Sequence, residues 1–92
     1  MSLHRHAVRR DANEQSLVSL LRQLGATWQP LSVKGGPDGM AGFQGQNYLI
    51  EIKRPGQKLR LTQQTWAENW CGSPVHVLRT PEDIYRLLRI KT

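Results

Sequence analysis

A β-strand is predicted by Tyr48-Leu49-Ile50-Glu51-Ile52-Lys53, a stretch of apolar residues interrupted by two charges. Successive side chains on a strand point to opposite faces. Glu51 and Lys53 therefore share one face, while Ile50 and Ile52 occupy the other. An acid and an amine held side by side on a rigid strand, together with an aspartate from a neighbouring segment, can bind a divalent cation and act on a water molecule.

The candidate aspartate is Asp38, which lies between Pro37 and Gly39. Pro-Asp-Gly is also a common turn signal, but the downstream Glu-x-Lys pair favours a metal site. Hard cations such as Mg²⁺ take oxygen ligands, typically one or two carboxylates with water and substrate phosphate. Asp38 and Glu51 are therefore the predicted metal ligands, with a solvent-facing strand position as the alternative for Glu51. Lys53 is predicted to orient or deprotonate the attacking water, or to stabilise transition-state charge; the alternative is a solvated edge lysine.

The rest of the chain predicts an alternation of helices and strands. Helices are expected over residues 11–24, over residues 61 to about 71 and from residue 80 onward, and strands over residues 27–33, 40–44, 48–53 and 75–78. Residues 40–44 and 48–53 are expected to form an antiparallel hairpin with a turn at residues 45–47. Residues 75–78 are apolar enough to lie inside a sheet. The order α-β-β-β-α-β-α indicates one α/β domain over residues 11–92, with helices packed against a single mixed sheet.

Start and stop signals support the helices. The first helix has one apolar face, made of Leu17, Leu20, Leu21 and Leu24. Asp11 or Asn13 could cap its start, and Gly25 ends it. Thr62 could cap the second helix. Thr80, followed by a proline and two acids, is a strong start for the third.

Glu14 belongs to the apolar face of the first helix, because it lies three, seven and ten residues before Leu17, Leu21 and Leu24. An acid on an inward face is costly to bury unless it is paired or near a cation. Glu14 is therefore a candidate for a role in the site. The alternative is an acid of the first turn that stays in water and interacts with the helix dipole.

The second helix carries Trp66 and Trp70 at helical spacing. Their rings could stack on nucleic-acid bases, but such spacing is more typical of core residues. Gln63 shares their face, where a glutamine could hold a water or a phosphate oxygen or could be an ordinary surface residue. Cys71 is the sole cysteine, which excludes an intramolecular disulfide and fits a reducing cytoplasm. It is expected to be a small packing residue.

The charge balance favours a polyanionic partner. Lys and Arg number 13 against 7 Asp and Glu, a formal net charge of +6, which suits DNA; a basic surface with no specific partner is the alternative. The candidate DNA-binding residues are Arg9 and Arg10, in a basic arm predicted at residues 1–10, and Lys34, Arg54, Lys58 and Arg60 around the site. No segment approaches the roughly 20 apolar residues that span a membrane, so no membrane association is expected.

The pattern resembles the VRR-NUC domains of the PD-(D/E)XK nuclease superfamily, above all the small stand-alone type of phages and bacteria. The resemblance covers about residues 11–88 and rests on segments in the same order: 11–14 (DANE), 35–39 (GGPDG), 42–53 (GFQGQNYLIEIK), 63–66 (QQTW) and 74–83 (PVHVLRTPED). The chain departs from the family at Gly39-Met40, where an apolar residue often follows the aspartate.

The resemblance implies a restriction-endonuclease-like fold and a Mg²⁺- or Mn²⁺-dependent endonuclease acting on DNA, with structured substrates such as Holliday junctions as one option. It implies the carbonyl of Ile52 as a third metal ligand, and supporting roles for Glu14 and Gln63. The small family members and the small size of the domain favour a homodimer with two sites. A cytoplasmic location in a bacterium or a phage-infected cell is expected. A non-catalytic nucleic-acid-binding module on the same fold is the alternative, against which the intact Asp-Glu-Lys set argues.

Overall fold

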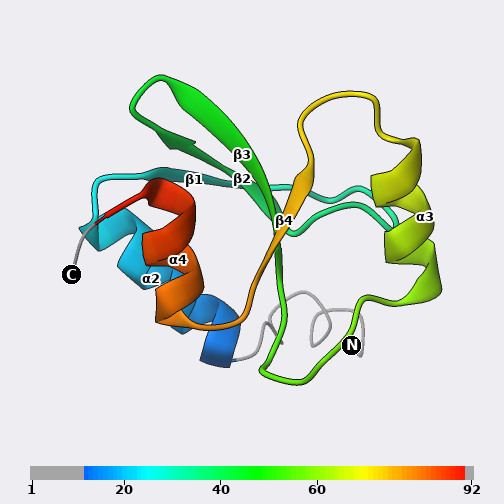
Figure 1. Cartoon of the computed structure of the whole chain (residues 1–92), viewed down its shortest axis with the longest axis horizontal. Helices are drawn as coiled ribbons and strands as arrows, with labels where there is room; N and C mark the ends of the chain where they lie inside the picture. Colours follow the sequence, from blue (N-terminus) through cyan, green and yellow to red (C-terminus); the bar gives the residue numbers. More distant parts are fainter. Residues whose placement is uncertain (1–11, 91–92) are drawn as a thin grey trace, which may run out of the picture.

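The computed structural model describes residues 12–90, which form a small α/β protein with three helices and a four-stranded mixed sheet (Figure 1). The elements follow the predicted order: α2 (Ala12–Gln23), β1 (Thr27–Pro30), β2 (Gly39–Phe43), β3 (Gln46–Ile52), α3 (Leu61–Asn69), β4 (Val75–Leu78) and α4 (Pro81–Leu88). The predicted basic arm, with Arg9 and Arg10, lies outside the described residues, as does Asp11. Within residues 12–90, no helix has the length and apolar character needed to cross a membrane.

The strands lie in the order β1-β2-β3-β4. β1 and β3 both pair antiparallel with β2, and β4 pairs parallel with β3. β3 is therefore held by hydrogen bonds on both sides. β4 lies at an edge of the described sheet, and only Leu78 in it is buried. The prediction that residues 75–78 lie inside the sheet is wrong, because the crossover through α3 returns the chain to the outer side of β3.

The hairpin of β2 and β3 confirms the predicted antiparallel pair but has a shorter turn. Phe43 pairs with Gln46, so the turn consists of Gln44 and Gly45 rather than residues 45–47. Both have positive φ, 50° and 80°, as a two-residue type I′ turn requires. β3 consequently begins two residues earlier than predicted.

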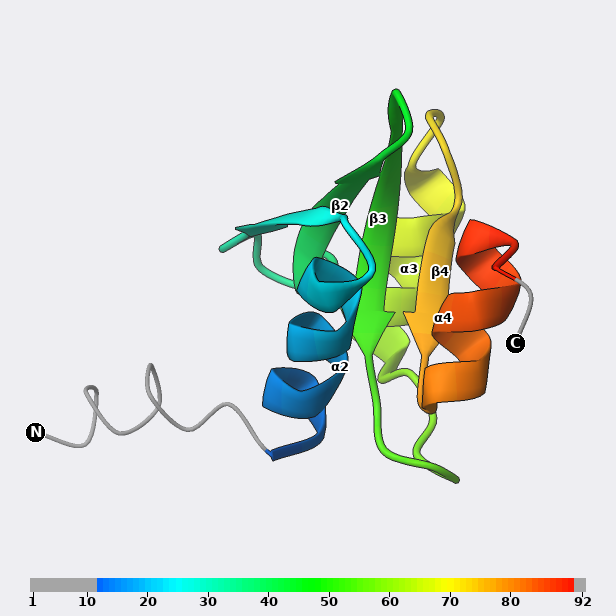
Figure 2. The same ribbon diagram turned by 90° about the vertical axis from the view of Figure 1, so that its left-hand side faces the viewer.

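α2 and α4 pack on one face of the sheet, and α3 lies on the opposite face (Figures 1 and 2). The hydrophobic core lies on the side of α2 and α4. Its largest fully buried members are Leu17, Leu21, Ile50, Leu78 and Ile84. Ile52 belongs to the same cluster, so Ile50 and Ile52 share the core face, as the alternation of β3 predicts.

α3 contributes no apolar residue to this core, and its only buried residue is Gln63. Trp66 is half-buried and Trp70 is 48 % exposed. The prediction that both tryptophans are core residues is therefore wrong. The physical reason is that α3 covers the other face of β3, where the charged side chains of Glu51 and Lys53 lie.

The helix ends follow the predicted signals in part. Gly25 has a φ of 101° and ends α2 as predicted. Thr80 is the N-cap of α4, where its hydroxyl accepts a hydrogen bond from the Asp83 backbone N–H at 3.3 Å. The predicted cap Thr62 lies inside α3 instead. That helix begins after Arg60, whose backbone N–H donates to Gln63 Oε1 at 2.9 Å.

Two further predictions need correction. β1 ends at Pro30 rather than at residue 33, because the chain leaves the sheet after the backbone N–H of Leu31 donates to the carbonyl of Asp38. Cys71 is exposed and free. It is not the small packing residue that was expected, because it follows α3 on the side of the sheet away from the core.

Candidate metal centre

Asp38 lies immediately before β2, opposite the end of β3. Gly39 pairs with Ile50, so the preceding residue, Asp38, falls opposite Glu51 and next to Ile52. The Asp38 Oδ2 atom accepts a hydrogen bond from the Ile52 backbone N–H at 2.7 Å. The backbone carbonyl of Asp38 accepts a second hydrogen bond, from the backbone N–H of Leu31 at 2.9 Å. Asp38 is therefore held against β3 and is not the tip of a free turn.

Glu51 is only 3 % exposed, which excludes the solvent-facing alternative. Its Oε2 atom accepts a hydrogen bond from Gln63 Nε2 at 3.0 Å and lies 3.4 Å from Lys53 Nζ. Its Oε1 atom is buried and has no hydrogen-bond partner among the described residues. A buried carboxylate oxygen without a partner is costly. A cation bound at this oxygen would offset that cost.

Lys53 is 6 % exposed, so it is no solvated edge lysine. It shares the α3 side of β3 with Glu51, as the two-residue period predicts. Its backbone N–H donates to the carbonyl of Leu78 at 3.0 Å, which anchors the residue to β4. A buried ammonium next to a carboxylate is positioned to act on a water or on a negatively charged transition state.

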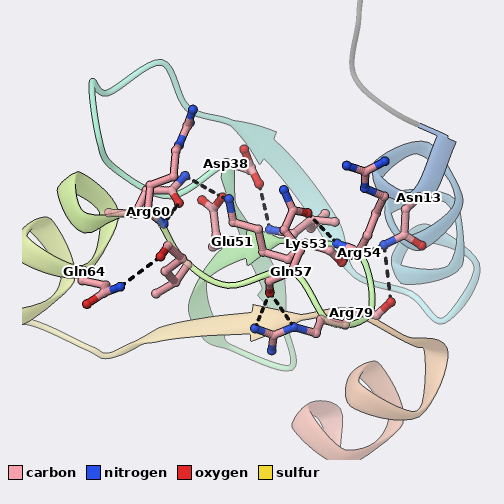
Figure 3. A network of polar contacts seen from close by, with 12 residues as sticks. Asn13, Asp38, Glu51, Lys53, Arg54, Gln57, Arg60, Gln64 and Arg79 are labelled. Atoms are coloured by element: carbon pink, nitrogen blue, oxygen red, sulfur yellow. Dashed lines mark hydrogen bonds and ion pairs between the residues drawn. The ribbon is translucent and has the colours of Figure 1, made fainter.

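The pKa of the Glu51 carboxyl is raised from 4.5 to about 7. Burial is the largest cause, the charge of Asp38 is the second, and the ammonium of Lys53 opposes both. The side chains of Asp38 and Glu51 lie together at the centre of the polar network in Figure 3. Two carboxylates that share a site resist simultaneous ionisation. A divalent cation bound to both would relieve this repulsion.

The backbone of Ile52 supports its predicted role as a third ligand. The N–H and the C=O of one residue in a strand point to the same side. The Ile52 N–H points toward Asp38, whereas the N–H of Lys53 points toward β4. The carbonyl of Ile52 consequently lies on the side of Asp38.

The donor set fits Mg²⁺ or Mn²⁺. Among residues 12–90, no group of three or more His, Cys, Asp or Glu side chains is placed to hold a metal ion. Two carboxylates and one carbonyl match a hard cation that keeps several waters. A cavity of about 10 Å³ lies beside Glu51, lined also by Gln63, Trp66 and the loop at residues 35–37. It has room for about one water molecule.

A second layer of polar contacts, which the sequence did not indicate, holds the ends of β3 and β4 (Figure 3). Asn13 Nδ2 donates to the carbonyls of Lys53 at 2.8 Å and Arg79 at 3.3 Å. Asn13 therefore ties strand ends together instead of capping α2. The Arg79 guanidinium donates twice to the carbonyl of Gln57, at 2.8 and 3.1 Å. No local sequence signal could have identified these roles of Asn13 and Arg79, because the partners of both side chains are backbone carbonyls far along the chain.

The remaining predicted site residues lie further out. Glu14 is half-buried and lines a hollow between α2 and β1 that includes Trp28 and Pro30; a supporting role for Glu14 stays a prediction. The described DNA-binding candidates are all exposed: Lys34, Arg54, Lys58 and Arg60. The structure thus brings together five of the predicted site residues, namely Asp38, Glu51, Ile52, Lys53 and Gln63.

No protein-family model, curated protein or solved structure matches this chain.

Proposed function

We propose that this protein is a metal-dependent DNA endonuclease of the VRR-NUC type and that its α/β fold is restriction-endonuclease-like. The observation that carries the proposal is the buried, unpartnered Oε1 atom of Glu51 beside Asp38. Burial and the neighbouring charge of Asp38 disfavour the ionised form of this carboxyl, and a bound divalent cation would stabilise it. Besides a metal ion, phosphodiester hydrolysis needs a group that acts on the attacking water or on the charge of the transition state, and the adjacent buried Lys53 can supply it.

In the proposed site, Asp38, Glu51 and the carbonyl of Ile52 would hold Mg²⁺ or Mn²⁺. When bound, the cation supplies polarisation of the scissile phosphate and a lowered pKa of bound water. Lys53 orients or deprotonates the attacking water, or stabilises negative charge in the transition state. Gln63 holds the Oε2 atom of Glu51, which leaves Oε1 for the metal.

DNA is the proposed substrate because the chain has a net charge of +6 and exposes basic residues on the loops around the site: Lys34, Arg54, Lys58 and Arg60. Nicking of supercoiled plasmid in Mg²⁺ and in Mn²⁺ is the direct test, with EDTA as the blank. A protein that binds the plasmid without nicking it in either metal would be a non-catalytic module instead. A panel of structured DNAs, including a four-way junction, then defines the preferred substrate.

Cation binding is expected to stabilise the wild-type protein. At a metal concentration ten times Kd, the free energy of unfolding should rise by about 1.4 kcal/mol, or about 5 to 10 °C in Tm. Because the pKa of Glu51 is about 7, the cation must displace a proton at low pH. The apparent affinity should therefore be about tenfold weaker at pH 6 than at pH 8. Differential scanning fluorimetry with Mg²⁺ or Mn²⁺ measures both effects.

The matched control for this measurement is Asp38→Asn, which keeps the shape of the side chain but removes one proposed ligand. Its Tm should be insensitive to the metal. An equal metal-induced rise in Asp38→Asn and in wild type would place the cation elsewhere.

We further propose that the protein forms a homodimer. A domain this small carries one site, and two-fold symmetry supplies a second site for the other DNA strand. Size-exclusion chromatography with light scattering at micromolar concentration, without DNA, should give the mass of two chains. The mass of one chain would contradict the dimer without affecting the proposed chemistry.

A further inference from the structure

Trp66 of α3 and Trp70, the residue that follows this helix, form a stack outside the hydrophobic core. The ring centroids of Trp66 and Trp70 are 4.9 Å apart and the rings are inclined by only 12°. Trp70 is the outer ring and is 48 % exposed. Large aromatic side chains usually bury most of their surface. A nearly parallel pair of rings with one exposed member is therefore unusual, and its flat apolar surface is available to contact a bound molecule.

The backbone around the stack leaves room for it. A β-carbon added at Gly36 would lie 3.3 Å from Cε2 of Trp66, and one added at Gly72 would lie 2.7 Å from Nε1 of Trp70. Both glycines therefore let the chain pass close to an indole edge. The two rings are held in place by their surroundings as well as by each other.

A hollow of about 310 Å³ lies against these rings. Besides Trp66 and Trp70, its lining consists of Thr62, Thr65 and Asn69. It combines flat aromatic surface with two hydroxyls and an amide, which can hydrogen-bond the polar edge of a planar ring. Its volume is at the lower end of the range for small-ligand sites.

Exposed basic residues lie near the start of α3, at the end of the hollow that Thr62 lines. A β-carbon at Gly35 would lie 3.4 Å from the carbonyl of Thr62, so the exposed Lys34 next to it lies near the start of α3. The exposed Lys58 and Arg60 precede the same helix. Glu68 is the only acid in α3, and the helical period turns it well away from the hollow. Aromatic surface within basic surroundings is typical of single-stranded nucleic-acid binding.

We propose that Trp70, stacked on Trp66, binds an unpaired nucleobase of single-stranded DNA. The inference rests on the proposed function for its biological meaning, and it narrows the substrate class to DNA with a single-stranded segment. Gln63, on the same helix, donates a hydrogen bond to Glu51. A base held on the stack would therefore place its strand close to the metal centre.

The test is fluorescence anisotropy with a labelled oligothymidine of about 12 nucleotides, in EDTA so that nothing is cleaved. Trp70→Ala should weaken binding roughly tenfold or more, since one base–aromatic stack contributes that much. Trp70→Phe should retain most of the affinity, because it keeps an aromatic face. An abasic oligomer with the same number of phosphates should bind wild type about as weakly as the oligothymidine binds Trp70→Ala.

The matched control is Leu61→Ala, which removes another apolar side chain of α3. Leu61 is 74 % exposed and does not line the hollow, so its variant should bind like wild type. The dependence of log Kd on log salt should be the same for Trp70→Ala and wild type, because the phosphate contacts remain.

Two results would overturn the inference: Trp70→Ala that binds the oligothymidine as tightly as wild type, or wild type that binds the abasic oligomer equally well. If Trp70→Ala instead converted a dimer to a monomer with unchanged DNA binding, this face would be an interface between two copies. Because no cleavage is measured, failure here leaves the nuclease proposal standing. Conversely, a protein that never cleaves DNA can still pass this test.

Discussion

Glu51→Gln is expected to remain folded and to lose metal-dependent nicking of plasmid DNA by about 10² to 10³ or more. Glutamine keeps the shape of the side chain, and its oxygen can still accept the hydrogen bond from Gln63 that Glu51 accepts at 3.0 Å. The glutamine amide lacks the negative charge with which the buried Oε1 atom of Glu51 is proposed to bind the cation. Rates from supercoiled-plasmid nicking at saturating Mg²⁺ and Mn²⁺ measure the loss, and circular dichroism checks the fold.

Glu82→Gln is the matched control, because Glu82 is an exposed acid in the first turn of α4. It should nick at the wild-type rate. Asp38→Asn and Lys53→Met should resemble Glu51→Gln, since they remove the other members of the same site. Nicking at the wild-type rate by a folded Glu51→Gln protein would refute the proposed metal centre, whatever the DNA-binding measurements show.

Gly39→Ala is expected to destabilise the protein by about 1 to 3 kcal/mol. A β-carbon at this position would overlap the indole of Trp28 and lie 2.8 Å from the carbonyl oxygen of Gln29. The carbonyl of Gln29 is backbone and the indole of Trp28 is a large rigid ring, so the backbone of β2 or the packing of Trp28 must shift. For a domain of this size that is a large share of the total stability. Urea unfolding followed by circular dichroism measures it.

Gly42→Ala in the same strand is the matched control. The β-carbon added there would lie 2.8 Å from the Thr27 hydroxyl oxygen. This hydroxyl can rotate away at the cost of its long hydrogen bond to the carbonyl of Gly42, at 3.4 Å, so the change in stability should be below about 1 kcal/mol. Trp28→Phe should relieve part of the cost in a Gly39→Ala background, giving non-additive effects. Equal stability of Gly39→Ala and wild type would show that Trp28 does not rest on this glycine. This packing also accounts for a glycine at the position that follows Asp38.

Several features of this chain were determined by local sequence alone. The alternation of Ile50, Glu51, Ile52 and Lys53 placed two side chains in the core and two on the opposite face, because the period of a strand is a property of its backbone. Thr80 and Gly25 marked helix ends, because a capping hydroxyl and a positive φ act within one turn. The order of the elements followed from such local patterns.

Other features were decided only by the tertiary structure. Whether Glu51 is exposed or buried depends on what covers the polar face of β3, and that is α3, through Gln63. The same placement leaves Trp70 outside the core despite its helical spacing from Trp66. Asn13 reaches the carbonyls of Lys53 and Arg79 across the fold, where no pattern of neighbouring residues could have located its partners. Periodicity specifies which side chains share a face, but burial and long-range hydrogen bonds depend on which element the chain brings to that face.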